Sequence, residues 1–390
     1  MSLRYFIRFL IISLVVSAVA CVEPYPAPDV SENLSILVVD GFLDGTNGVA
    51  TVRLTHTTKL IDDEEFPAEK GADVTIKSEF GDFFTLTELD SGRYRAEGLA
   101  INPAVRYQLL IDTKGGDQYI SDYVIVKDSP PIDSVTWRPD GDGVSIMANT
   151  HDDTGESKYY RWDYVETWEY HAPFLSSFKV VDGEVIYRQP QELVYACYQT
   201  VPSTKILVTS SVRLEDDVIR DFKLTYIPRV SSRISVMYSI LVKQRVIEEA
   251  EFEFWQDLQR VTESLGGLFD SQPYEIVGNI HHVKDPSTKV LGYFSAGFVK
   301  EQRMFLGYLD LPNELQKRPY HGCQVDTVCV IRTPSTIQNC SIDVPNLPPN
   351  SFLLGPLTEG PSIWGYTRGS EQCSDCREQG GVLTRPDFWP

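Results

Sequence analysis

Residues 36–55 read ILVVDGFLDGTNGVATVRLT, and this stretch decides the fold class. Residues 44–48, DGTNG, are the residue types that favour a turn. After the turn, Ala50, Val52 and Leu54 alternate with polar or small residues, so they lie on one face of a strand. The segment therefore predicts two β-strands joined by a tight turn, each with one buried face.

The same pattern continues outward from this hairpin. The double proline Pro130-Pro131 cannot lie in a central strand and marks the end of the unit. We therefore predict an Ig-like or transthyretin-like β-sandwich over residues 36–127. Further strand-like runs occur at 72–77, 83–89, 93–96, 107–112 and 119–124. This order of strands and turns resembles the carboxypeptidase-regulatory-like modules, which implies a spacer or docking unit.

A larger β-rich domain is predicted over residues 132–390. Strand-like runs recur in it, for example at 144–148 and 159–168. One segment is helical instead, because apolar residues repeat every three or four positions and two glycines follow. This predicts a helix over 247–265, inserted among the strands. The fold class is therefore mainly β.

The first twenty residues are predicted to be a secretory signal peptide, residues 1–20. Two arginines precede an apolar run at 9–16 that is too short for a transmembrane anchor. The letters AVAC at 18–21 resemble a bacterial lipobox, which makes Cys21 the predicted lipidation site. An ordinary small-residue cleavage site is the alternative. Residues 21–35 begin with alternating prolines and predict an extended tether between the lipid anchor and the folded body.

Composition limits the partners. The chain has 390 residues, 55 acidic and 35 basic side chains, and a net charge of −20. Binding of nucleic acid requires a basic surface that neutralises phosphates, so nucleic acid is excluded as a main partner. The length favours about two or three domains, and a hydrophobic content of 42% excludes a wholly disordered chain.

Cysteine is the most informative residue type. Of the seven cysteines, six remain if Cys21 is lipidated. An even number in an exported protein predicts up to three disulfides, with about fifteen pairings left open. The CxxC spacing of the last two also fits a redox or zinc pair, although no thioredoxin-like helix start and no second CxxC accompany it. The candidate disulfide cysteines are Cys197, Cys323, Cys329, Cys340, Cys373 and Cys376.

An aromatic run is the candidate binding platform. Even spacing places Trp162, Tyr164, Trp168 and Tyr170 on one strand face. Such a face either packs in the core or stacks on a sugar, a peptide or a receptor surface. The sequence lacks the serine-hydrolase GxSxG, the zinc HExxH and a phosphate-binding glycine loop. We therefore predict no catalytic residue, no metal site and no cofactor.

An ordered set of short motifs resembles one known family. The motifs are YSILVKQ at 238–244, GLFDSQP at 267–273, GNI at 278–280, VLGYFSA at 290–296, CSDCR at 373–377 and PDFW at 386–389. They resemble the Bacteroidota lipoprotein family catalogued as domain-of-unknown-function family 4249. The resemblance implies a lipoprotein of the outer membrane, exposed at the cell surface, with a TonB-dependent receptor barrel as partner.

These observations predict a non-catalytic binding or accessory subunit of a TonB-dependent uptake system, held at the membrane by its lipid anchor. A structural or assembly subunit of an outer-membrane complex is the alternative. A hydrolase of glycans or peptides is a further one, because a catalytic pair of carboxylates is recognised by its separation in space.

Overall fold

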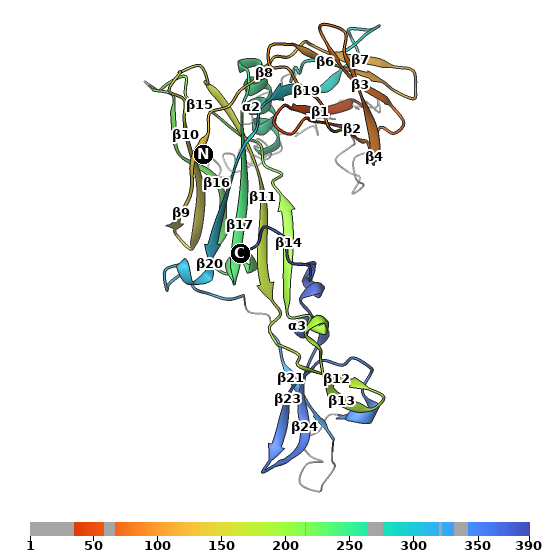
Figure 1. Cartoon of the computed structure of the whole chain (residues 1–390), viewed down its shortest axis with the longest axis vertical. Helices are drawn as coiled ribbons and strands as arrows, with labels where there is room; N and C mark the ends of the chain where they lie inside the picture. The colour runs from red at the N-terminus through yellow and green to blue at the C-terminus, as the bar shows by residue number, and fades with distance from the viewer. Residues whose placement is uncertain (1–34, 58–66, 215, 264–275, 320–321, 331–341) are drawn as a thin grey trace, which may run out of the picture.

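Three β units follow one another along the long axis of the molecule (Figure 1). The computed structural model describes residues 35–57, 67–214, 216–263, 276–319, 322–330 and 342–390. We call the units the N-terminal sandwich, the central sandwich and the distal sheet. The fold is mainly β with an inserted helix, which confirms the predicted class. Within the described ranges, no helix combines the length and the apolar character that a membrane crossing requires.

The N-terminal sandwich is built from a continuous path of strands in the order β18-β7-β6-β3-β4-β5-β2-β1-β19-β8. Its strands from the first part of the chain are β1 (Leu37–Asp44), β2 (Val49–His56), β3 (Asp73–Ser78), β4 (Phe83–Asp90), β5 (Arg93–Ala96), β6 (Tyr107–Asp112), β7 (Gln118–Ser121) and β8 (Val126–Lys127). Two more strands, β18 (Ile280–His282) and β19 (Val290–Gly297), come from the part of the sequence that was predicted to belong to the larger β-rich domain, residues 132–390. Alternation could not reveal this return, because strand partners are chosen by tertiary packing.

The returning strand joins the first one directly. β1 runs parallel to β19, with Leu37 opposite Val290 and Asp44 opposite Gly297. Gly41 allows the close approach of the Phe294 ring, because a Cβ at this position would lie 3.0 Å from Cδ2 of that ring and would push it aside. The buried amide of Asn279 then ties β18 to β19. Its Oδ1 accepts from the Phe294 backbone N–H and its Nδ2 donates to the Phe294 carbonyl, both at 2.8 Å.

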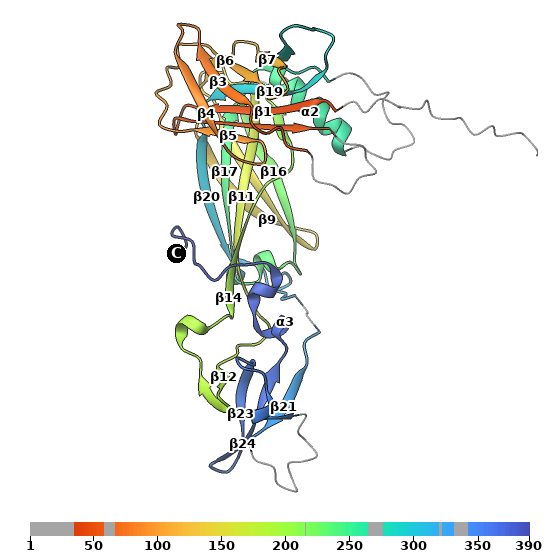
Figure 2. The same cartoon turned by 90° about the vertical axis from the view of Figure 1, so that its right-hand side faces the viewer.

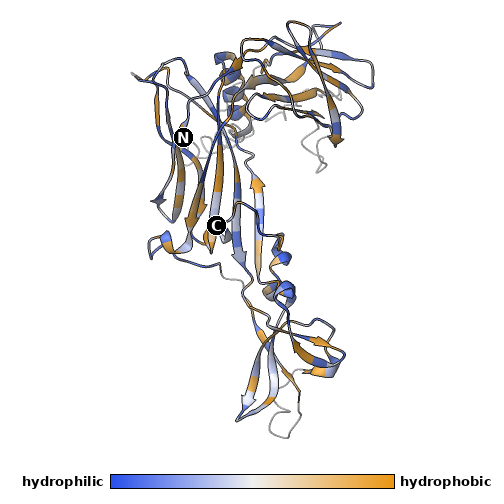
Figure 3. Cartoon of the chain, in the orientation of Figure 1, coloured by the Kyte–Doolittle hydropathy of each residue, from blue (hydrophilic) through white to orange (hydrophobic). Residues whose placement is uncertain are grey.

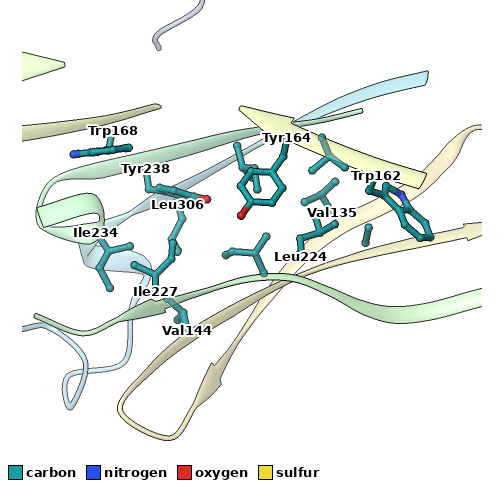
Figure 4. Close-up of a cluster of buried hydrophobic side chains, with 14 of the residues drawn as sticks. Val135, Val144, Trp162, Tyr164, Trp168, Leu224, Ile227, Ile234, Tyr238 and Leu306 are labelled. Atoms are coloured by element: carbon teal, nitrogen blue, oxygen red, sulfur yellow. The ribbon is translucent and has the colours of Figure 1, made fainter. Parts of the chain in front are cut away.

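The central sandwich packs two sheets around one core. The larger sheet has the order β14-β11-β17-β20, with β15 also paired to β11, and the smaller has the order β16-β10-β9. Alternating apolar residues of both sheets meet between them (Figure 4). The strands are β9 (Ile132–Asp140), β10 (Gly143–His151), β11 (Tyr159–His171), β14 (Ala196–Pro202), β15 (Leu207–Ser210), β16 (Val218–Pro228), β17 (Met237–Val246) and β20 (Lys300–Gly307).

One long helix, α2 (Glu249–Glu263), packs where the two sandwiches meet (Figure 2). It falls within the predicted range of 247–265, whose last two residues lie outside the described part of the chain. Phe254 and Trp255 are buried against Tyr293 of β19. The apolar repeat that predicted the helix includes Phe254 and Val261 but not Trp255. The buried face is rotated from it, because Val261 is 43% exposed whereas Trp255 is buried.

The distal sheet forms the far end of the molecule, with the order β13-β12-β23-β24-β21-β22 and a small core of its own. Hydrophobic and hydrophilic residues alternate along its strands, as they do in the other two units (Figure 3). Its strands are β12 (Phe178–Val181), β13 (Glu184–Tyr187), β21 (Val325–Cys329), β22 (Ile342–Asp343), β23 (Leu353–Glu359) and β24 (Ser362–Gly369). The short helix α3 (Glu371–Ser374) follows it. The 3₁₀ helices of the chain include Pro190–Glu192, Ser232–Ile234, Tyr308–Asp310, Val344–Asn346 and Cys376–Gln379.

Candidate functional site

A cleft of about 510 Å³ opens where the N-terminal sandwich meets the central one. Strands β1, β2 and β5 line one side of it, and β11 and β17 line the other. Six basic and three acidic side chains line this cleft, although the whole chain has a net charge of −20. Its volume falls in the range of small-molecule sites, roughly 300–1,000 Å³.

The register of two neighbouring strands places two arginines opposite each other at the cleft. In the antiparallel pair of β11 and β17, Arg161 lies opposite Arg245, and Asp163 lies opposite Lys243. These residues face the cleft, because the residues between them, such as Trp162, point to the core on the other side of the sheet. Like charges directly opposite on paired strands destabilise a sheet. The arrangement is therefore costly in the absence of a compensating contact.

Aromatic rings hold both guanidinium groups in place. The Cζ of Arg161 lies 3.7 Å from the ring centroid of Trp255, and the Cζ of Arg245 lies 4.3 Å from that of Phe42. Stacking of this kind fixes the plane of a guanidinium and leaves its edge free to donate hydrogen bonds. The arginines belong to the central sandwich, whereas the rings come from α2 and from β1 of the N-terminal sandwich. The orientation of the pair therefore depends on how these units pack together.

Few carboxylates contact the two arginines, and their distances are long. Arg161 Nη2 lies 3.6 Å from Asp163 Oδ1, and Arg245 Nη2 lies 4.0 Å from Glu251 Oε1. Three buried nitrogens, namely Nε and Nη1 of Arg161 and Nε of Arg245, have no hydrogen-bond partner. The Arg245 side chain is nonetheless nine-tenths buried, since the residue is 9% exposed. Each unmatched buried donor costs about 1–3 kcal/mol.

The buried glutamate behind the arginines is held by other groups. Glu251 Oε1 accepts hydrogen bonds from Trp255 Nε1 at 3.1 Å and from Ser295 Oγ at 3.0 Å. Burial raises the pKa of Glu251, against the opposing attraction of Arg245 and Arg161. Burial also lowers the pKa of Arg245, and the charge of Arg161 adds to this effect. Both members of the Arg245–Glu251 pair are thus less stable as ions than in water.

Asp163 is one of the three acids that line the cleft, and its pKa favours the ionised form. Burial by itself raises the pKa of Asp163, but Arg161, Arg245 and Lys243 outweigh it and lower the pKa below its ordinary value. A carboxylate held in this state is a poor proton donor near neutral pH. Together with the two arginines, this set of charged residues is suited to the binding of a charged group.

A family profile described as "Domain of unknown function (DUF4249)" matches residues 22–303. The chain belongs to this family. The matched residues contain the N-terminal sandwich, the helix, every residue of the cleft and the central sandwich as far as the first half of β20. The motifs at 373–377 and 386–389 lie outside them. No curated protein matches the sequence of this DUF4249 member.

Solved structures with local likeness to the DUF4249 chain are only remotely similar. A two-domain fibronectin type-III segment from chicken tenascin is 13% identical, covers 55% of this chain and 92% of its own, and has a TM-score of 0.16. A structure titled as manganese lipoxygenase of Gaeumannomyces graminis with partial zonadhesin of Komagataella pastoris is 10% identical, covers 55% and 90%, and has a TM-score of 0.17.

The predicted aromatic platform of this DUF4249 chain lies in the core. Trp162, Tyr164, Trp168 and Tyr170 are 0%, 4%, 7% and 2% exposed. Trp162, Tyr164 and Trp168 point from β11 into the space between the two sheets, where Figure 4 shows them among aliphatic neighbours. Tyr170 belongs to the same buried cluster, and its hydroxyl donates to the Cys376 carbonyl at 2.8 Å. The prediction that the four rings lie on one face of the strand is confirmed, but that face is buried. The four rings are therefore not a stacking surface for a ligand, and core packing explains them.

The cysteines form structural disulfides. Cys197 is bonded to Cys376, and Cys323 is bonded to Cys373. The two cysteines of the CxxC motif therefore have different partners and are neither a redox pair nor a zinc pair. Cys329 is disulfide-bonded as well. The predicted sites at Cys340 and at the lipidation position Cys21 lie outside the described residues.

The residues that line the charged cleft were not recognised from the sequence. Arg161 and Arg245 each occur in an apolar strand, where the aromatic and aliphatic residues dominate the pattern. The alternation that places Trp162 in the core also places Arg161 on the opposite face, and this was the available signal. The register that brings the two arginines together depends on strand pairing across about 80 residues and is not readable from either strand alone.

Proposed function

We propose that the protein is a lipid-anchored, non-catalytic binding subunit that acts beside a TonB-dependent receptor at the outer membrane. The cleft between the two sandwiches carries the binding role, because a pair of oriented arginines is suited to holding a ligand. The lipobox-like sequence at 18–21 supports the anchor. Membership of the DUF4249 family, together with the resemblance described above, supports the receptor as partner.

Co-purification tests the partner. Native membranes are extracted in a mild detergent, the protein is captured with an antibody, and the bound proteins are identified by mass spectrometry. We expect a TonB-dependent barrel to co-purify in a fixed ratio. A repeated failure to recover one under several mild detergents contradicts the accessory role. Turnover of a peptide or a glycan by the purified chain would favour the hydrolase instead.

Membrane attachment has a separate test. A Cys21→Ser variant is expected to move from the membrane fraction to the soluble fraction, because one acyl anchor supplies all of the attachment in this proposal. A Cys329→Ser variant is the matched control, since it removes a cysteine of the distal sheet and leaves the anchor in place. Retention of Cys21→Ser in the membrane would contradict lipid anchoring at this residue.

A further inference from the structure

We infer that Arg161 and Arg245 form a binding site for an oxyanion, a carboxylate or phosphate group of a small ligand in the cleft. The inference rests on the proposed function only in that the protein binds a ligand, and it does not depend on the receptor. It names the chemical class of that ligand.

The first support is the incomplete pairing of the two arginines. Buried charges are normally paired and hydrogen-bonded, because an unmatched one costs several kcal/mol. Here the closest carboxylate contacts of the two guanidiniums are 3.6 Å and 4.0 Å, beyond an ordinary hydrogen bond. Three of their buried nitrogens have no partner. An oxyanion supplies the acceptors that these N–H groups lack.

The second support is the geometry of the pair. A guanidinium presents parallel N–H donors that match the two oxygens of a carboxylate or phosphate. Trp255 of α2 and Phe42 of β1 stack on the two guanidiniums and fix their planes. Arg161 and Arg245 lie opposite each other on paired strands, where Cβ atoms are about 5 Å apart. One anionic group between them therefore accepts from both and also relieves their mutual repulsion.

The third support is the charge of the surrounding groups. Lys243 contacts Glu301 at 2.9 Å, Arg93 contacts Asp90 at 2.7 Å and Arg95 contacts Glu97 at 2.6 Å, so these cations have close partners. Asp40 and Asp163 also line the cleft, and they limit its net charge. The sixth cation, Arg53, is exposed to solvent. The buried donors without a partner are those of the facing arginines, which places the site at their edges.

The ligand is expected to have an apolar part beside its anionic group. Phe42, Val49 and Leu89 line the same cleft on the side of the N-terminal sandwich. A small organic acid or a phosphorylated metabolite fits this combination of charge, apolar wall and volume. A cation does not, because the facing side chains are arginines.

Ligand-induced stabilisation tests the site on the purified full-length protein, without any receptor. Inorganic phosphate and citrate are the two probes, and sodium chloride of matched ionic strength is the reference. We expect the melting temperature to rise with the logarithm of the concentration of at least one probe, because binding to the folded state alone stabilises it. The probe that acts distinguishes phosphate from carboxylate. No rise above the chloride reference with either probe would overturn the inference.

Two variants locate the effect. Arg161→Gln is expected to weaken binding of the active probe by about 10- to 100-fold, since it removes charged hydrogen bonds. Arg138→Gln is the matched control, because this exposed arginine on β9 pairs with Asp221 at 3.5 Å, is not among the residues that line the cleft and carries the same charge. Equal weakening in both variants would show a nonspecific effect of net charge and refute the site.

A conservative variant separates the loss of the guanidinium from a loss of folding. Arg161→Lys keeps the charge and lacks the planar set of donors, so it is expected to fold and to bind more weakly than the native protein. Binding as tight as that of the native protein would overturn the role of the guanidinium. A failed receptor pull-down leaves this result intact, so failure of the site and failure of the proposed partner are distinguishable.

Discussion

The same substitution, tryptophan to phenylalanine, is expected to have different effects on stability at two positions of β11, Trp162 and Trp168. Trp162 donates a hydrogen bond from Nε1 to Gln244 Oε1 at 3.1 Å, and Gln244 is fully buried. Trp168 is also buried, but its Nε1 has no partner. We expect Trp162→Phe to destabilise the protein more than Trp168→Phe, although each change removes one indole and keeps one ring.

The size of the difference follows from the hydrogen bonds. In Trp162→Phe, the Oε1 of Gln244 loses its donor inside the core, and an unsatisfied buried acceptor costs about 1–3 kcal/mol. In Trp168→Phe, the change removes a buried N–H that was already unmatched, which offsets part of the packing lost with the smaller ring. The free energy of unfolding is therefore expected to fall by about 1–3 kcal/mol more for the first variant than for the second.

Urea denaturation followed by far-UV circular dichroism measures both variants without relying on tryptophan fluorescence. Trp168→Ala is the reference for lost packing, with an expected cost of about 3–5 kcal/mol for a buried tryptophan. Equal midpoints for the two phenylalanine variants would refute the hydrogen-bond argument. A Trp168→Ala variant as stable as the native protein would refute the placement of this ring in the core.

Three further predictions concern other parts of the fold. Asn279→Ala leaves the backbone N–H and C=O of Phe294 unmatched and is expected to cost about 2–5 kcal/mol, with faster amide exchange at Phe294; unchanged exchange there would contradict it. A Cys197→Ser and Cys376→Ser double variant is expected to lose about 2–5 kcal/mol in a thermal melt, and an unchanged melting temperature would count against a stabilising role. Burial raises the pKa of Asp152, but hydrogen bonds from Ser157 and Thr154 outweigh it and lower the pKa to about 2. Its stabilising effect is therefore complete above the ordinary value of 3.8 and is lost as the pH falls towards 2; an NMR titration midpoint near the ordinary value would refute this.

Local sequence patterns predicted the elements of this protein well. Alternation over Ala50, Val52 and Leu54 correctly indicated β2, and all three residues are buried. The three-to-four spacing indicated the helix that became α2. These patterns work because strand and helix each impose a fixed period on the residues that contact the core.

Contacts between distant segments were beyond such patterns. The addition of β18 and β19 to the first sandwich involves the hydrogen bonds of Asn279 to Phe294 and the contact of Gly41 with the Phe294 ring. These contacts appear only when residues far apart in sequence are brought together. The candidate site could not be predicted from the sequence for the same reason. Its arginines are opposite each other through strand register, and the burial of Glu251 depends on Ser295 and on the way α2 packs.

The interleaving of the three units determines when the molecule can become complete. Synthesis releases Leu37 long before its neighbour Val290, and at about 5–20 residues per second the interval is on the order of 10–50 s. During that time the edge of β1 that later meets β19 has no strand beside it, and such an edge is prone to pair with other chains. The central sandwich is also incomplete during this time, because its strand β20 ends only at Gly307. The last strand of the N-terminal sandwich, β19, ends at Gly297, shortly before β20 of the central sandwich begins at Lys300. Both sandwiches are therefore completed late and close together, and the edge of β1 needs protection until β19 has been made.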